Sequence, residues 1–262
     1  MPETQPLYLQ ENQPDGVPPL ALTGERTLPD VPLENYWYRR HLVVYEWIRA
    51  RVGGLDVVDM ACGEGYGSAV LARTAKRVVG VDANPEAHEH ARLRYTGPNV
   101  RFARDLVETF AEPADAVVFL QTIEHVRNPD EILEHFKAMT AASAAPAVFV
   151  TTPNLLTLAP EGAEKSENPW HVKEYRAHEF RALCEAHFAH VELYGLFHAG
   201  KLGIHQYAIE NLGWDRIHKT LRFSKPFYDR FTPAISTADF AIRPADADDL
   251  DRALDFLAVC RP

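Results

Sequence analysis

The chain has 262 residues, of which 46% are hydrophobic, and a formal net charge of −10. This length suits one large α/β domain with a sizeable insertion better than two independent domains. The negative charge argues against nucleic acid or an acidic membrane surface as a partner, because both are bound through clustered Lys and Arg.

The start of the chain, residues 1–32, is rich in proline and lacks regularly spaced apolar residues, so we expect an extended arm there. Residues 33–262 are expected to form the domain itself. From Leu33 to about Arg51, apolar residues recur at helical spacing, which predicts a helix or a helix pair.

Strands and helices are then expected to alternate along the chain. The predicted strands lie at about 55–59, 77–82, 99–103, 115–120 and 146–151, with a further strand near 189–196 and a terminal one near 253–259. The predicted helices lie near 67–75, 85–95, 128–141 and 176–188. Because the strands are almost wholly apolar, the pattern indicates a doubly wound α/β fold with a mostly parallel sheet buried on both faces.

A long segment, 197–247, separates the last two predicted strands and carries many aromatic and basic residues. We expect it to be an insertion that either covers the substrate or forms a dimer contact, and the sequence does not choose between the two. The first residues show no basic stretch followed by an apolar core, and no stretch reaches membrane-spanning length. We therefore expect a cytoplasmic protein without a membrane partner.

A glycine-rich turn follows the first predicted strand, with the sequence Gly63-x-Gly65-x-Gly67. Glycines allow a ligand to approach the backbone closely, and the helix beyond them presents unpaired N–H groups. Asp82 ends the second strand about 20 residues later, where a carboxylate can accept hydrogen bonds from both ribose hydroxyls. The sequence therefore predicts a nucleoside site, although dinucleotide dehydrogenases share this turn and this acid.

Asp59 before the turn, Asp105 after the third strand and Glu124-His125 after the fourth complete a set that resembles a class I S-adenosylmethionine-dependent methyltransferase. The resemblance implies a Rossmann-like seven-stranded sheet with an antiparallel last strand. It also implies that the turn contacts the methionine part of S-adenosylmethionine, that Asp82 holds the ribose and that Asp105-Leu106 flanks the adenine. The full set of expected cofactor residues is Tyr36, Arg39, Asp59, Ala61, Cys62, Gly63, Gly65, Asp82, Ala83, Asp105, Leu106 and Gln121.

Three residues of this set have a second interpretation or a condition attached to them. Arg39 pairs with the cofactor carboxylate in one interpretation, whereas a solvated helix face explains it almost as well. Cys62 needs only a small side chain and is interpreted as structural. Ala61 stands where the related sequences usually have glycine, and an alanine there is tolerable only with a negative φ.

His125 is the best candidate for a general base, because it follows the fourth strand at the edge of the sheet where ligands bind. Glu124 orients this ring or binds substrate, and His171 in Asn168-Pro169-Trp170-His171 is a reserve base. A pair of residues that merely shapes the pocket is the alternative. Ubiquinone-pathway O-methyltransferases carry Glu-x-x-Glu-His at this place, associated with a divalent cation, but here Gln121 replaces the first Glu. We therefore expect chemistry without a metal.

Further stretches resemble an actinobacterial sugar O-methyltransferase family associated with methylglucose lipopolysaccharide biosynthesis: Leu22–Pro29, Glu34–Arg40, Asn168–His171, Gly195–His198 and Leu254–Pro262. The resemblance implies O-methylation of a glucose-containing saccharide in polysaccharide biosynthesis. A homodimer is an option because the 197–247 insertion can form a dimer contact. Two alternatives stay open: a small phenolic or lipid-like acceptor, suggested by the aromatic insertion, and a cofactor-binding protein without turnover.

Overall fold

The computed structural model describes residues 10–160, 162–246 and 249–262. The chain divides into two compact units. One unit contains the described residues up to Val44 together with His198–Ala241, and the other contains Tyr45–Phe197 and Ile242–Pro262. The expected arm over 1–32 and insertion over 197–247 remain predictions. Within the described part of the chain, no helix is both long enough and apolar enough to cross a membrane.

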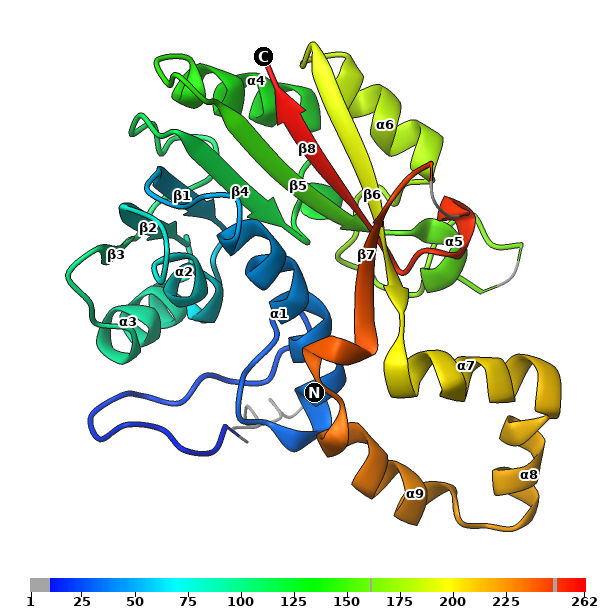
Figure 1. The fold of residues 1–262 in the computed structure, drawn as a ribbon. Helices are drawn as coiled ribbons and strands as arrows, with labels where there is room; N and C mark the ends of the chain where they lie inside the picture. The colour runs from blue at the N-terminus through cyan, green and yellow to red at the C-terminus, as the bar shows by residue number, and fades with distance from the viewer. Residues whose placement is uncertain (1–9, 161, 247–248) are drawn as a thin grey trace. The chain divides into compact units, whose positions relative to one another are not determined.

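An eight-stranded sheet forms the core of the fold, in the order β3-β2-β1-β4-β5-β8-β6-β7 (Figure 1). Its strands are β1 (Asp56–Met60), β2 (Arg77–Val81), β3 (Val100–Ala103), β4 (Ala116–Leu120), β5 (Ala147–Pro153), β6 (His190–His198), β7 (Phe240–Pro244) and β8 (Asp255–Arg261). Strands β1 to β5 pair in parallel, and β8 runs antiparallel between β5 and β6. The predicted α/β fold with a mostly parallel sheet and an antiparallel last strand is confirmed.

The sheet has one strand more than the seven expected. The additional strand, β7, lies at the edge and its side chains are mostly half-buried or exposed. An edge strand of this kind needs no unbroken apolar sequence, so the pattern that predicted the central strands does not detect it. The central strands are different, because every residue of β4 and β5 is buried.

Helices cover both faces of this sheet. In Figure 1, α4 (Pro129–Thr140) and α6 (Ala177–Glu185) lie on one face, and α2 (Tyr66–Leu71) and α3 (Pro85–Arg94) lie on the other. The starts of the helices follow from the sequence. Asn84 caps α3 by accepting a hydrogen bond from the backbone N–H of Ala87, and Pro85 and Pro129 occupy first-turn positions that need no N–H donor. Since α2, α3 and α4 each follow a parallel strand in the chain, the loops that precede them lie at the carboxyl-end edge of the sheet.

The smaller unit contains α7 (Gly200–Leu212), α8 (Trp214–Thr220) and α9 (Ser224–Phe231), all within the predicted insertion. Aromatic rings pack these helices together: the His205 ring stacks on Phe227, and Trp214 contacts Phe227 edge to face. Helix α1 (Asn35–Arg49) follows a short 3-10 turn, Pro32–Glu34. Its beginning belongs to the smaller unit and its end, from Tyr45, to the larger one.

Candidate active site

Most of the predicted site residues lie at one edge of the sheet. Strands β1, β2 and β4 are neighbours and parallel, so their carboxyl ends meet, and the loops after them carry the glycine turn, Asp82 and His125. Tyr36 and Arg39 are exceptions, because they belong to the other compact unit. There the Tyr36 hydroxyl lies 2.9 Å from His198 Nε2, and Arg39 Nε donates to Asn35 Oδ1. Their part in cofactor binding stays a prediction.

The turn after β1 is built from left-handed backbone. Gly63 has a φ of 57° and Gly65 a φ of 96°. A Cβ on Gly65 would lie 2.7 Å from the Ala91 Cβ and 3.0 Å from the Phe102 ring, so this position needs glycine for space as well as for torsion. Cys62 is buried and unpaired, as its structural interpretation requires.

The expectation of a negative φ at Ala61 is wrong: its φ is 55°. The fold imposes this torsion, because the chain must reverse directly after Met60 while the Cys62 N–H bonds the Val81 carbonyl at 2.9 Å. An L-residue in this region is strained by roughly 1–2 kcal/mol. The strain is therefore present in the folded protein.

Replacing Ala61 by glycine is expected to stabilise the cofactor-free protein by about 0.5–1 kcal/mol, because relief of the torsional strain outweighs the added flexibility of the unfolded chain. Urea unfolding of both proteins measures the difference. Ala83→Gly is the matched control, since Ala83 is exposed and has no positive φ. That control should be neutral or destabilising, and a destabilised Ala61→Gly protein would contradict the strain.

Asp82 closes the turn from the neighbouring strand. Its Oδ2 accepts the Gly63 N–H at 2.8 Å, and its Oδ1 accepts the Asn84 N–H at 2.9 Å. The residue is only half-buried, and each carboxylate oxygen can accept a second hydrogen bond. Asp82 is thus fixed in place by the backbone and can still accept hydrogen bonds from a ligand. The adjacent Ala83 is exposed.

Asp59, by contrast, is completely buried beneath the turn. Its Oδ1 accepts the Tyr45 hydroxyl at 3.2 Å and its Oδ2 accepts the Ser68 hydroxyl at 2.6 Å, which links α1 and α2 to β1. Burial raises the pKa of Asp59 to about 7, against the effect of these two hydrogen bonds. The carboxyl group holds the base of the turn from the protein side.

This raised pKa predicts a pH-dependent stability. Asp59 ionises near pH 3.8 in the unfolded chain but only near pH 7 in the folded chain. The stability that its protonated form gives to the folded state is therefore lost as the pH rises from about 4 to about 7. Between pH 5 and pH 8 the cofactor-free protein should lose about 2–3 kcal/mol of unfolding free energy through this group. Urea titrations at several pH values give the unfolding free energy as a function of pH. This free energy should fall less steeply with rising pH in Asp59→Asn than in the parent protein, and equal pH dependence would contradict the assignment.

Glu64, inside the glycine turn, was not among the predicted site residues, yet it anchors the turn. Its side chain is buried, and its oxygens contact His90 Nε2 at 3.0 Å, the Tyr95 hydroxyl at 2.7 Å and Arg94 at 3.3 Å. All three partners come from α3 or its end. A carboxylate among glycines in a tight turn is the sequence signal for such an anchor.

The loops after β3 and β4 place the remaining expected cofactor residues. Asp105 Oδ1 accepts the Thr109 hydroxyl and the Leu106 N–H, and these hydrogen bonds lower the pKa of Asp105. The Leu106 side chain is 53% exposed and offers an apolar surface. Gln121 has a φ of 50° and its side-chain amide donates to Thr151 on the neighbouring strand.

The three predicted catalytic residues lie together. The rings of His125 and His171 are 4.8 Å apart, edge to face, and Glu124 Oε1 lies 4.0 Å from His125 Nε2. Backbone hydrogen bonds hold the two segments: the Glu124 carbonyl accepts the N–H groups of Val172 and Lys173 at 2.7 and 3.1 Å. The structure thus brings together residues that are far apart in the sequence.

Each histidine has an acceptor at Nδ1. For His125 it is the Trp170 carbonyl at 3.2 Å, and for His171 it is Glu174 Oε1 at 2.6 Å. Because a carbonyl can only accept, the His125 hydrogen bond requires the proton on Nδ1, and the neutral ring then has its lone pair on Nε2. Glu174 fixes His171 in the same tautomer, whose Nε2 accepts from the Asn168 amide at 3.0 Å.

Glu174 was missed by the sequence reasoning, although its spacing of three residues from His171 is a usable signal. Burial raises its pKa, but hydrogen bonds from Ser166 and the contact with His171 outweigh burial, so the net shift of the Glu174 pKa is downward. Glu174 is therefore an anionic partner for His171.

Glu124 has the opposite character. It is 1% exposed, and burial raises its pKa to about 8. The Thr152 hydroxyl lies close enough to lower this pKa somewhat, but neither Thr152 Oγ1 nor Glu124 Oε2 completes a hydrogen bond of good geometry. A buried carboxyl oxygen without a hydrogen bond is costly, and it lies beside two imidazoles.

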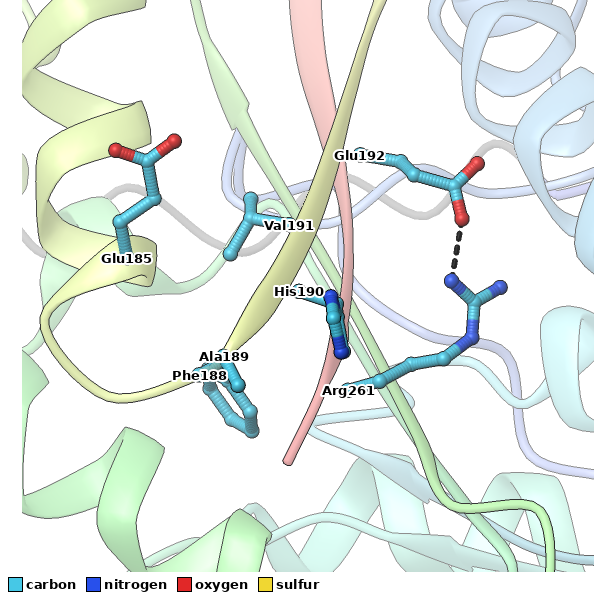
Figure 2. A pocket seen from close by; sticks show the side chains of 7 residues that line it. All are labelled: Glu185, Phe188, Ala189, His190, Val191, Glu192 and Arg261. Carbon is cyan, nitrogen blue, oxygen red and sulfur yellow. Dashed lines mark hydrogen bonds and ion pairs between the residues drawn. The ribbon is translucent and has the colours of Figure 1, made fainter.

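A hollow of about 840 Å³ lies elsewhere on the larger unit, between the start of β6 and the end of β8 (Figure 2). There Glu192 and Arg261 form an ion pair. Because Val148 at the start of β5 pairs with Cys260, this hollow lies at the edge opposite to Asp82 and His125. It contains none of the predicted site residues.

Comparisons with known proteins give consistent relatives. A family model described as a methyltransferase domain matches residues 36–195. A probable S-adenosylmethionine-dependent methyltransferase of Mycolicibacterium smegmatis is 35% identical over 94% of this chain and 97% of that protein. One of Mycobacterium tuberculosis is 36% identical over 92% of this chain and 89% of that protein.

A ubiquinone biosynthesis O-methyltransferase of Pseudoalteromonas translucida is 34% identical over 46% of this chain and 56% of that protein. Among solved structures, an S-adenosylmethionine-dependent methyltransferase of Thermotoga maritima, described as a possible histamine N-methyltransferase, superposes with a TM-score of 0.57. It is 12% identical and covers 87% of this chain and 93% of its own, so it shows a shared fold.

Proposed function

Because this chain belongs to the S-adenosylmethionine-dependent methyltransferases, we propose that it methylates a hydroxyl of a glucose-containing oligosaccharide or polysaccharide precursor. We place this reaction in the cytoplasm and in polysaccharide biosynthesis. The observation that carries the proposal is the contact between His125 and Trp170. The Trp170 carbonyl orients the His125 ring, and the Trp170 indole is exposed.

The larger unit fits the cofactor. The turn lacks side chains at Gly63 and Gly65, and Asp82 keeps accepting capacity while the backbone fixes it, as a ribose diol requires. The exposed Leu106 offers an apolar contact for adenine. Asp82 and the turn would hold the nucleoside and methionine parts, while Asp59 and Glu64 support the turn from below.

S-adenosylmethionine supplies an electrophilic methyl group, so an alcohol acceptor mainly needs help to become nucleophilic. His125 gives that help in this proposal: its Nδ1 hydrogen is engaged by the Trp170 carbonyl, and its Nε2 takes the hydroxyl proton as attack proceeds. Glu124 lies beside the ring, and His171 with Glu174 forms a second oriented pair. No metal ion takes part in this proton transfer.

The saccharide acceptor is supported by Trp170. Its side chain is 65% exposed, and its carbonyl contacts His125. The residue that orients the candidate base therefore also offers a flat apolar surface. An exposed indole of this kind combines a large apolar face with a polar N–H, which suits a sugar ring that has an apolar face and hydroxyl edges. The sequence resemblance to sugar O-methyltransferases includes this same stretch.

A direct test incubates the protein with methyl-labelled S-adenosylmethionine and panels of glucose oligomers and phenols, and detects products by mass spectrometry. Labelled saccharide is the expected product. Transfer only to phenols would sink the saccharide assignment, and cofactor binding without any product would favour a binding protein without turnover.

Trp170→Ala is expected to raise the KM for the saccharide about tenfold, because loss of an aromatic contact of roughly 0.5–1.5 kcal/mol adds to lost apolar burial. Cofactor affinity should not change. Val172→Ala is the matched control, since Val172 is also exposed on this loop but has no aromatic face to offer a sugar ring. Equal kinetics for both variants would remove Trp170 from the acceptor site.

A phenolic acceptor is the second candidate. It is favoured by the similarity to the ubiquinone biosynthesis O-methyltransferase of Pseudoalteromonas translucida, which covers less than half of this chain. The same panel decides between the two, because both acceptors use the same methyl donor and the same candidate base.

A further inference from the structure

Three side chains that can each bind a metal ion lie close together in the candidate active site: Glu124, His125 and His171. Each offers one ligand atom, and the three atoms lie within 4.8 Å of one another. No other group of three or more His, Cys, Asp or Glu of this kind occurs among the described residues. Glu124 and His125 are adjacent in the chain, whereas His171 comes from a separate segment.

We propose that Glu124, His125 and His171 form a binding site for a divalent cation of the zinc class, such as Zn²⁺ or Co²⁺. Two imidazoles and one carboxylate are ligands that these ions prefer, whereas Mg²⁺ and Ca²⁺ prefer oxygen-rich sets. The lack of a carboxylate at Gln121 therefore does not remove cation binding, because His171 supplies a third ligand of a different chemical type.

The surroundings of the ligands support this assignment independently. Glu124 Oε2 is buried and makes no hydrogen bond, so a cation would satisfy an oxygen that the protein leaves unsatisfied. Both imidazoles have Nδ1 engaged by an oxygen acceptor, Trp170 for one ring and Glu174 for the other. Metal-bound histidines characteristically have such a partner, which leaves Nε2 as the ligand atom.

The site must contract to bind. Ligand atoms about 2.0–2.2 Å from a tetrahedral ion lie roughly 3.3–3.5 Å apart, which is closer than the present spread. His125 is 25% exposed on its side chain and has room to move, whereas Glu124 and His171 are buried. The Asn168 amide, now 3.0 Å from His171 Nε2, has to give way to the ion.

Cation binding has a consequence that rests on the proposed function. A cation on His125 Nε2 occupies the lone pair that accepts the hydroxyl proton, so the ring cannot bind the ion and act as base at once. Zinc-class cations should therefore inhibit methyl transfer, with half-inhibition at the concentration that half-fills the site, and a chelator should restore activity.

The test measures Co²⁺ binding to the chelator-treated full chain by visible absorption and calorimetry, independently of any activity. We expect one Co²⁺ per chain. Glu124→Gln and His171→Ala should each weaken binding at least about 100-fold, and Glu174→Gln about 10–100-fold, as expected for loss of a ligand and of its orienting partner. His178→Ala, an exposed histidine on α6, is the control and should bind like the parent.

The outcomes separate the two proposals. Co²⁺ binding that is absent, or that survives both Glu124→Gln and His171→Ala, overturns the cation site. Cation binding with the expected losses supports the site even if no acceptor is methylated, in which case the proposed function fails alone. If the chelated protein is inactive and Co²⁺ restores turnover, the cation site stands and the assignment of His125 as the general base is wrong.

Discussion

Replacing His125 by alanine is expected to lower turnover about 10²–10⁴-fold, the usual contribution of a general base, with little change in affinity for S-adenosylmethionine. The reason is geometric: the Trp170 carbonyl holds the ring in the tautomer whose Nε2 can accept a proton. Single-turnover assays with saccharide and calorimetry with the cofactor measure the two quantities separately.

His178→Ala provides the control for this experiment, because His178 is exposed on α6, which carries none of Glu124, His125 and His171. It should keep parental turnover. His171→Ala should have a smaller effect than His125→Ala. If His125→Ala turns over nearly normally while His171→Ala does not, the base is His171, and if both are nearly normal, no residue of the pair acts as base.

Asp82→Ala is expected to weaken S-adenosylmethionine binding by roughly 1.5–3 kcal/mol, or about 10–150-fold, the range of hydrogen bonds to a charged group. Both Asp82 oxygens already accept backbone N–H groups, so part of this loss comes from a looser turn. Asp82→Asn keeps one carbonyl acceptor and should fall between the parent and the alanine variant. Calorimetry on the folded proteins gives the affinities.

Asp115→Asn is the matched control for Asp82. Asp115 Oδ2 also accepts a backbone N–H, from Asp56 at 2.9 Å, but it lies before β4 at the opposite edge of the sheet. Its loss should leave cofactor affinity unchanged. An Asp82→Ala protein that is folded and binds the cofactor like the parent would place the ribose elsewhere.

The sequence predicted most of the sheet because its central strands are unbroken apolar runs between turn residues. Val117, Val118 and Phe119 are completely buried on a strand that the pattern located to within one residue. Helices α7, α8 and α9 of the smaller unit were not predicted as elements. Their ring contacts, such as Trp214 with Phe227, join residues of different helices, so the pattern within each short segment is weak.

The sequence named candidate site residues but did not predict how they are arranged. Strand ends indicated Asp82 and His125, since parallel strands bring their carboxyl ends to one edge. Nothing in the local sequence states that His171 lies against His125, because a loop docked by backbone hydrogen bonds to Glu124 creates that contact. The positive φ of Ala61 is likewise imposed by the turn as a whole and not by the residue.

The position of β8 has a consequence for the order in which the molecule can fold. Residues 255–261 form a strand in the interior of the sheet, between β5 and β6, although they come after all the other strands in the chain. During synthesis, β5 and β6 therefore each keep one edge with unpaired backbone N–H and C=O groups until this segment leaves the ribosome. The half of the sheet from β1 to β5 contains only parallel neighbours already synthesised, so it can form first and act as the template on which the late strand is captured.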